Sequence, residues 1–283
     1  MVEQLITSEL RRWLVEQAQG GHTPEQVLAA MLASGWAEAV ARKALEEAAN
    51  DALQTQRGSG GLPGVSRVPE PDLSGSTPRL WAGDRWVKVL LTLRHPRIIV
   101  FGDLLSDEEC DAMRALAGTR LARSETVAIA SDGSEVNDAR TSEGMFFERG
   151  ETALIQRVEA RVAALLNWPL AHGEGLQVLR YRPGAEYLPH YDYFDPDHAG
   201  TPAILKRGGQ RVATLVTYLN TPEAGGATTF PDVRLEVSPI KGNAVFFSYD
   251  QPRPLTQTLH GGAPVLAGEK WVATKWLREG VFT

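Results

Sequence analysis

From about residue 81 onward the chain consists of short apolar runs separated by turns rich in Gly and Pro, and this pattern limits the folds it can adopt. Many of the runs alternate apolar and polar residues, which is typical of strands with one buried face. The predicted strands are Arg97–Phe101, Gln177–Tyr181, Arg211–Leu219, Arg234–Val237, Asn243–Tyr249, Thr256–His260 and Trp271–Leu277. So many short strands favour a β-sandwich or a barrel.

Two helices interrupt these strands. Ser106 and Glu109 form a capping box that predicts a helix running to about Ala117. Residues 152–166 carry apolar side chains at helical spacing. The sequence therefore predicts an α+β domain over residues 81–283, in which helices support a β-sandwich or barrel.

The first 80 residues have a different character. Residues 1–56 show helical spacing in three short segments, and the second opens with Thr23, Pro24 and Gln26 in a capping-box pattern. They predict a small three-helix bundle, similar to ubiquitin-associated modules in size and pattern only. It is either a structural appendage or a docking module for a protein partner. Residues 57–80, rich in Gly, Pro and Ser, predict a flexible linker.

The composition of the chain argues against several classes of function. A single cysteine, Cys110, excludes disulfides within one chain and metal sites built from several cysteines. The chain has no apolar run of about 18 residues and no secretory signal pattern at its start, so we expect no membrane span and a cytoplasmic location. The net charge of −6 argues against nucleic acid as a partner.

A candidate metal site begins at the segment Tyr187–Phe194. If this segment is a strand, His190 and Asp192 point to the same face. His260 lies 70 residues after His190, and Lys270 follows ten residues later. Two histidines and one carboxylate form the facial triad of non-haem Fe(II) oxygenases, which leaves coordination positions open. A nearby lysine could bind the carboxylate of a co-substrate.

Four segments carry a family resemblance: HYDYF, RVATLVTYLNTPEAGGATTFP, VSPIKGNAVFF and LHGGAPVLAGEKWVATKW. From about Arg97 to Arg278 the chain resembles the catalytic domain of the prolyl 4-hydroxylase family of 2-oxoglutarate- and Fe(II)-dependent dioxygenases. The resemblance implies a double-stranded β-helix (jelly-roll) core. It also implies that 2-oxoglutarate is decarboxylated to succinate and CO2 while a C–H bond is hydroxylated. Ascorbate keeps the iron reduced in many members.

The resemblance also implies roles for individual residues. The iron ligands would be His190, Asp192 and His260. The residues around 2-oxoglutarate would be Lys270, which pairs with its distal carboxylate, Tyr181, Thr214 and Trp276. The residues on the substrate side would be Arg140, Ser142, Glu174 and Tyr187. Arg140 and Glu174 could equally form structural ion pairs, and Tyr181, Thr214 and Trp276 could belong to the core.

Function stays open between two classes at this point. The leading hypothesis is an enzyme that hydroxylates a prolyl residue of a peptide or protein, with hydroxylation of a free amino acid or other small molecule as an alternative. The second class is a catalytically silent, metal-binding scaffold whose N-terminal bundle docks a partner. The complete triad argues against an inert scaffold, and a metal-binding cupin-like protein would not need Lys270, ten residues after His260.

Overall fold

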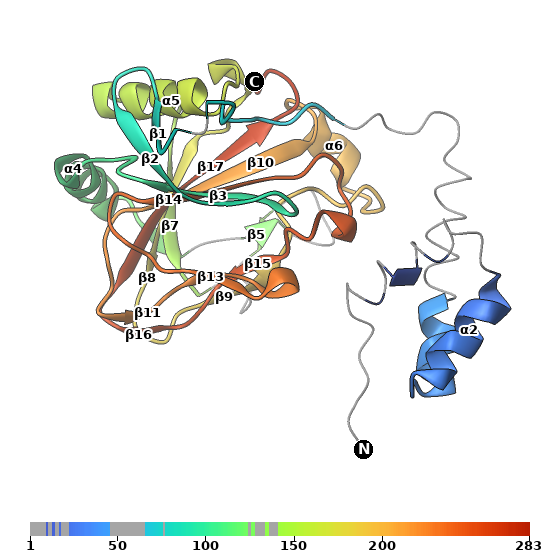
Figure 1. Ribbon diagram of the computed structural model, residues 1–283. Coiled ribbons are helices and arrows are strands. Elements are labelled where there is room, and N and C mark those ends of the chain that lie inside the picture. The colour runs from blue at the N-terminus through green and yellow to red at the C-terminus, as the bar shows by residue number, and fades with distance from the viewer. Residues whose placement is uncertain are drawn as a thin grey trace. The chain divides into compact units, whose positions relative to one another are not determined.

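The computed structural model of the chain (Figure 1) describes residues 10, 13–14, 17, 23–45, 66–75, 77–123, 126–127, 134–135 and 141–283. The chain divides into two compact units, residues 1–64 and residues 65–283, and each is considered by itself. Within the described ranges, no helix combines the length and the apolar character that crossing a membrane requires.

The N-terminal unit contains helix α2 (Pro24–Ala33), which begins as the sequence predicts. The Thr23 hydroxyl accepts a hydrogen bond from the Gln26 backbone N–H, and the Gln26 side chain accepts one from the Thr23 N–H. Residues 38–45 are also helical. Both segments contribute to one apolar cluster, formed by Leu10, Leu14, Val27, Met31, Ala41 and Ala44. Most of the first predicted helix lies outside the described residues, so the three-helix bundle stays a prediction.

The larger unit is built on a nine-stranded sheet in which all neighbouring strands are antiparallel. In spatial order its strands are β1 (Arg79–Trp81), β2 (Trp86–Leu93), β3 (Arg97–Gly102), β14 (Ala244–Ser248), β10 (Arg211–Tyr218), β17 (Lys270–Arg278), β8 (Leu176–Tyr181), β7 (Glu143–Phe147) and β4 (Ala122–Arg123). Strand β17, beside the central strand β10, is buried along its whole length.

A second, four-stranded antiparallel sheet packs with the first. Its strands, in order, are β13 (Leu235–Val237), β12 (Thr228–Phe230), β15 (His260–Gly262) and β9 (Tyr187–His190). Two short pairs complete the strands, β11 (Ala224–Gly225) with β16 (Val265–Ala267) and β5 (Thr126–Val127) with β6 (Ser134–Glu135). Two antiparallel sheets with added helices form an α+β unit of the kind expected for a jelly roll.

An apolar cluster joins the two sheets. Ile98, Phe247 and Val272 come from the large sheet, and Phe230 and Val237 come from the small one. The small sheet lies at the lower side of the unit in Figure 1, with β9, β13 and β15 close together. Burial of these side chains holds the sheets against each other, so residues at the ends of β9 and β15 have a fixed place.

Helices α4 (Asp107–Gly118) and α5 (Ala153–Leu165) lie side by side on the unit, as Figure 1 shows. Both predicted helices are confirmed. Ser106 and Glu109 form the capping box of α4, and Thr152 caps α5. Their apolar faces pack on the large sheet in a cluster that includes Cys110, Met113, Ala117, Ile155, Val158, Phe147 and Val178.

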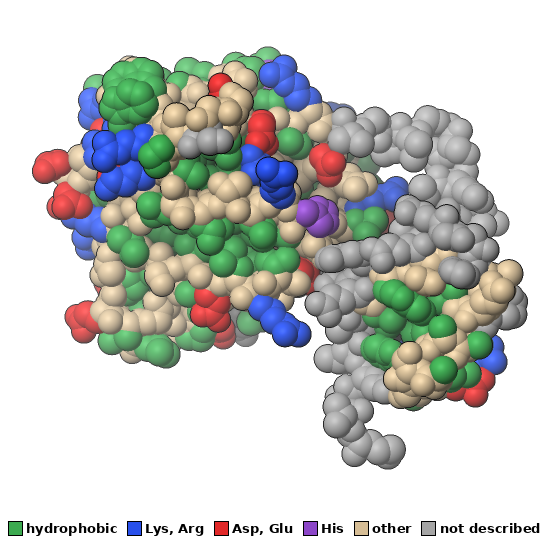
Figure 2. All heavy atoms as spheres, in the orientation of Figure 1, with side chains coloured by type: hydrophobic (Ala, Val, Ile, Leu, Met, Phe, Trp, Pro, Cys, Tyr) green, Lys and Arg blue, Asp and Glu red, His purple; other side chains and the backbone are tan. Residues whose placement is uncertain are grey.

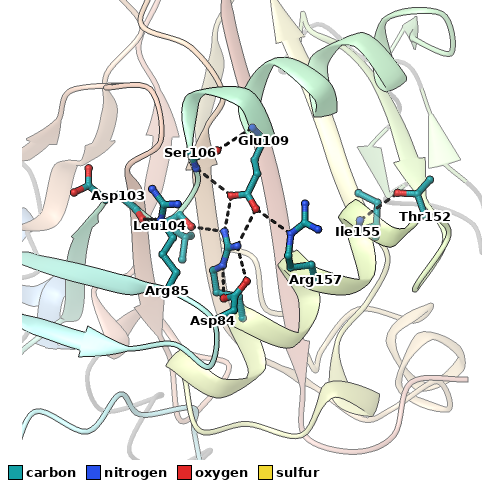
Figure 3. Close-up of polar contacts among 10 residues, drawn as sticks. Asp84, Arg85, Asp103, Leu104, Ser106, Glu109, Thr152, Ile155 and Arg157 are labelled. Atoms are coloured by element: carbon teal, nitrogen blue, oxygen red, sulfur yellow. Dashed lines mark hydrogen bonds and ion pairs between the residues drawn. The ribbon is translucent and has the colours of Figure 1, made fainter.

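An ion cluster centred on a buried arginine joins the two helices to the β1–β2 turn (Figure 3). At its centre is Arg161 of α5, which donates hydrogen bonds to Asp84, to Glu109 and to the Leu104 carbonyl. Arg157 also pairs with Glu109. Burial alone would raise the pKa of Glu109, but the two arginines and the Ser106 N–H lower it to about 2. The cluster therefore needs an ionised Glu109.

The structure differs from the prediction of a flexible linker at residues 66–73. This segment, which we call the strap, lies against the larger unit. The Ser66 N–H donates to the Asp250 carbonyl, and the Glu70 N–H donates to the Leu166 carbonyl. Val68 and Leu73 pack on the core. The local composition resembles a linker, but these two apolar residues are spaced so that both reach the core.

One face of the larger unit is shown with its side chains in Figure 2. On the face in view in Figure 2, basic and acidic side chains are interspersed with apolar ones.

Candidate metal centre

The three side chains predicted to bind a metal lie together on the small sheet. His190 ends β9 and His260 begins β15, and the two residues face each other in antiparallel register. Asp192 carboxylate oxygens lie 3.6 Å from His190 Nε2 and 3.4 Å from His260 Nε2. One potential ligand atom from each residue lies within 4.8 Å of the others. This donor set fits a single divalent iron.

Backbone carbonyl groups orient both imidazole rings. His190 Nδ1 lies 2.9 Å from the Leu188 carbonyl oxygen, and His260 Nδ1 lies 3.0 Å from that of Thr258. A carbonyl oxygen can only accept, so each Nδ1 carries the proton and each Nε2 keeps its lone pair. Burial and the nearby His260 lower the pKa of His190, which favours its neutral form. Both Nε2 atoms are therefore ready to bind a metal.

Asp192 is buried and ionised. Burial alone would raise the pKa of this carboxyl group, but His260 and His190 offset that effect and hold the pKa well below its usual range. The Thr214 hydroxyl donates to Asp192 Oδ2 over 2.7 Å. A buried carboxylate between two imidazoles is the arrangement that a bound cation would stabilise.

Two backbone predictions around the triad are wrong. Asp192 does not share a strand with His190, because β9 ends at His190. The predicted strand Thr256–His260 is instead a short 3-10 helix, Pro254–Thr256, followed by Gln257 with a left-handed φ of 53°. The left-handed backbone of Gln257 interrupts the extended conformation that a ladder needs, and β15 begins only at His260.

A cavity next to the triad contains Lys270. Its lining residues are Leu179, Tyr181, Tyr187, His190, Asp192, Val216, Thr228, His260, Gly261, Gly262, Lys270, Val272, Thr274 and Trp276. Lys270 is 4% exposed, and burial, the one cause acting on it, lowers its pKa to about 8. No described acidic residue forms an ion pair with it. A buried ammonium group without a counter-ion fits an anionic ligand in the cavity.

Tyr181 and Trp276 also line this cavity, as the prediction of a co-substrate site requires. Tyr181 is the partner of Lys270 in the β8–β17 register, and the Lys270 Nζ lies 5.5 Å from its ring centroid. Trp276 Nε1 is buried and has no hydrogen-bond partner among the described residues. These groups therefore offer donors to a ligand beside Lys270.

Sequence reasoning missed Thr228. This buried residue lines the cavity, and its Oγ1 accepts a hydrogen bond from the Tyr218 hydroxyl over 2.9 Å. Its own proton is thus left to donate to a ligand. The segment GGATTFP contains Thr228, but nothing in the residue pattern distinguishes it from the adjacent Thr229. Thr228 is distinguished from Thr229 only by the placement of β12 beside β15 in the folded sheet.

The residues predicted for the substrate side differ in their relation to this cavity. Tyr187 lines the cavity, and its ring stacks on that of His190 with centroids 3.7 Å apart. Ser142 is fully buried and is not part of the cavity lining. Arg140 lies outside the described residues.

Glu174 forms a buried ion cluster with Arg211 and Arg278. Its carboxylate pairs with Arg211 at 2.7 Å and with Arg278 at 2.9 Å. Burial alone would raise the pKa of Glu174, but the two guanidinium groups lower it below its usual value. Arg211 also lies over the Trp276 ring, 4.0 Å from its centroid. Glu174 is absent from the cavity lining, and the contacts the structure shows for it are these ion pairs, so its role toward substrate stays a prediction.

Thr214 also departs from its expected place. It is fully buried and hydrogen-bonds to Asp192, and it is not one of the residues that line the cavity. Its contact is therefore with the metal-site carboxylate rather than with the co-substrate cavity.

Comparison with known proteins agrees with this geometry. Residues 176–278 match the profile of the 2OG-Fe(II) oxygenase superfamily. Prolyl 4-hydroxylase 1 of Arabidopsis thaliana is 39% identical over 228 residues, which cover 70% of this chain and 77% of the relative. Probable prolyl 4-hydroxylase 3 of the same plant is 38% identical over 221 residues, 71% of this chain and 75% of the relative.

A solved structure is also similar. It is a viral collagen prolyl hydroxylase from Paramecium bursaria Chlorella virus 1 in its 2OG complex. It is 32% identical, with a TM-score of 0.50, over 64% of this chain and 94% of that chain.

The fold, the His–Asp–His group and the adjacent buried lysine define a 2-oxoglutarate- and Fe(II)-dependent dioxygenase. Within that class, the chain belongs to the prolyl 4-hydroxylase family.

Proposed function

We propose that this dioxygenase hydroxylates prolyl residues of a peptide or protein, with His190, Asp192 and His260 as the iron ligands. The observation that carries the proposal is the triad itself, with ligand atoms within 4.8 Å, beside the unpaired ammonium group of Lys270. Iron with 2-oxoglutarate supplies the oxidising chemistry that a C–H bond requires. The relatives named prolyl 4-hydroxylases support the choice of substrate.

The protein's own contribution is to bind and orient. Lys270 would hold the distal carboxylate of 2-oxoglutarate, with Tyr181 and Thr228 donating to the same group. Part of the cavity wall is apolar and would exclude water from the co-substrate; it is formed by Leu179, Val216 and Val272. Tyr187, stacked on His190, would face the substrate from the open side of the site, where His190 is partly exposed.

The charged cluster of Glu174 and Arg211 would act more indirectly. Arg211 lies over Trp276 and also donates to the Asp192 carbonyl at 3.4 Å. It therefore connects the cavity wall with the backbone of a metal ligand. We propose that this cluster holds both in place.

The test is succinate formation in the presence of Fe(II), 2-oxoglutarate and proline-rich peptides. We expect turnover that depends on the peptide, and a peptide product heavier by one oxygen atom on a prolyl residue. A matched peptide with alanine in place of each proline should give neither. The variant Asp192→Ala should lose turnover while keeping its circular dichroism spectrum. Undiminished turnover by this variant would contradict the ligand assignment, and turnover with free amino acids alone would contradict the peptide substrate.

Other features remain part of the proposal. Ascorbate, as a reductant of the iron, would sustain turnover over many cycles. The N-terminal unit would dock a protein partner, which would bring substrate to the larger unit. The cytoplasmic location stays a prediction.

A further inference from the structure

Tyr249 is connected to a metal-site carboxylate through a single side chain, that of Thr214. It follows directly after β14 and is 2% exposed. Its hydroxyl oxygen lies 2.9 Å from Thr214 Oγ1, and Thr214 in turn lies 2.7 Å from Asp192 Oδ2. The three groups thus form a continuous chain of hydrogen bonds inside the protein.

The direction of this chain follows from counting protons. An ionised carboxylate only accepts, so the single hydroxyl proton of Thr214 goes to Asp192. Tyr249 must then donate its own proton to Thr214 Oγ1. The hydrogen bonds therefore run from Tyr249 through Thr214 to Asp192, and each group donates one hydrogen bond to the next. Buried hydrogen bonds arranged in this way reinforce one another.

Asp192 needs such support more than the two histidines do. His190 and His260 lie on paired strands, and backbone carbonyls two residues upstream hold both rings. Asp192 lies beyond the end of β9, in a bend without strand partners. Its carboxylate orientation therefore depends on side-chain contacts.

The two hydroxyl groups come from a rigid part of the sheet. Thr214 on β10 pairs with Phe247 on β14 in the antiparallel register. The Tyr249 N–H donates to the Val212 carbonyl over 2.9 Å, which continues the pairing past the end of β14. The positions of both hydroxyls are thus fixed by the central strands of the large sheet.

We propose that Tyr249, acting through Thr214, is a positioning residue that fixes the orientation of the Asp192 carboxylate for metal binding. This inference rests on the proposed function, because it requires the triad to hold a divalent metal. Groups that hydrogen-bond to metal ligands commonly change metal affinity by about 10- to 100-fold. Tyr249 and Thr214 together should have an effect of that order.

The experiment is an anaerobic calorimetric titration of the full-length protein with Mn(II), which reports metal affinity without turnover. Thr214→Val removes both hydrogen bonds and should weaken Mn(II) binding by about 10- to 100-fold. Thr214→Ser keeps the hydroxyl and should restore affinity close to wild type. Tyr249→Phe keeps the packed ring and should weaken binding less than Thr214→Val, but measurably. Thr217→Val, at another buried threonine on β10, is the control and should leave affinity unchanged.

The outcomes separate this inference from the proposed function. Wild-type affinity in Asp192→Ala would overturn the ligand assignment itself. Loss of binding in Asp192→Ala together with wild-type affinity in Tyr249→Phe and Thr214→Val would overturn only the positioning role. Should Thr214→Val fail to fold, Tyr249→Phe decides the question alone, since it removes one oxygen atom and leaves the ring contacts with Phe247 and Tyr193 in place.

Discussion

At the scale of single residues, Lys270 is the side chain whose role can be tested most directly. It is buried, its pKa is lowered to about 8 by burial, and it lines the cavity beside the triad. We expect Lys270→Ala to raise the 2-oxoglutarate concentration needed for half-maximal turnover by about 10- to 100-fold. This is the effect expected from the loss of one buried, charge-assisted hydrogen bond. The Fe(II) requirement should change far less, because Lys270 is not one of the three ligands.

The measurement is succinate formation, titrated separately with 2-oxoglutarate and with Fe(II). The matched control is Lys241→Ala, since Lys241 forms a surface ion pair with Asp111 at 2.9 Å. It should leave both requirements unchanged. Equal increases in both requirements for Lys270→Ala would show that this lysine does not anchor the co-substrate.

Residue type and spacing predicted the centre of the site better than its surroundings. His190, Asp192 and His260 carry chemistry that few other residue sets can supply, so their pattern was informative. Thr214 and Thr228 are ordinary strand threonines in the sequence. Which of them reaches the cavity and which reaches Asp192 depends on how β10 and β12 lie in the two sheets. Such long-range pairing has no local signal.

At the scale of secondary-structure elements, local signals explain where prediction succeeded. The capping boxes of α2 and α4 act within four residues, so both helix starts could be predicted. Six of the seven predicted strands coincide with strands of the structure, because alternation marks a half-buried strand. The segment 256–260 also alternates, yet it forms a turn. The left-handed backbone of Gln257 outweighs the pattern.

The contact between α4 and α5 makes stability depend on pH. Glu109 lies between Ser106 and Arg157 in Figure 3, and its pKa in the folded protein is about 2, against an ordinary value of 4.5. A depressed pKa means that ionised Glu109 stabilises the fold above pH 4.5, by up to about 3 kcal/mol. That contribution is lost as the pH falls from 4.5 toward 2.

The variant Glu109→Gln tests this contribution, since its amide oxygen can still accept from the Ser106 N–H. We expect it to be less stable than wild type near pH 7 in urea unfolding, and the difference to shrink steadily below pH 4.5. Glu236→Gln, at an exposed position on β13, is the control and should show no such trend. A difference from wild type that stays constant between pH 7 and pH 3 would rule out the ionic mechanism.

At the scale of the whole molecule, the chain contains two compact units, and the boundary between them has a physical definition. The three core clusters of the larger unit draw, among the described residues, only on positions after residue 65. The strap belongs to that unit because Val68 and Leu73 pack on the same core as the strands. Composition alone assigns it to a linker, because two apolar side chains among many Gly, Pro and Ser barely change the average composition of the segment.

The strap therefore predicts different outcomes for two truncated variants. Removal of residues 1–64 should leave the Tm of the larger unit unchanged, because its core loses nothing. Removal of residues 1–75 also uncovers the core beneath Val68 and Leu73, and should cost on the order of 2–4 kcal/mol. For a unit of this size that corresponds to a Tm lower by about 4–16 °C. Differential scanning calorimetry of both variants measures it, with Leu73→Ala in the full chain expected to give part of the same loss. Equal Tm values for the two truncated variants would show that residues 66–73 contribute nothing to the core, and the boundary would then lie near residue 80 after all.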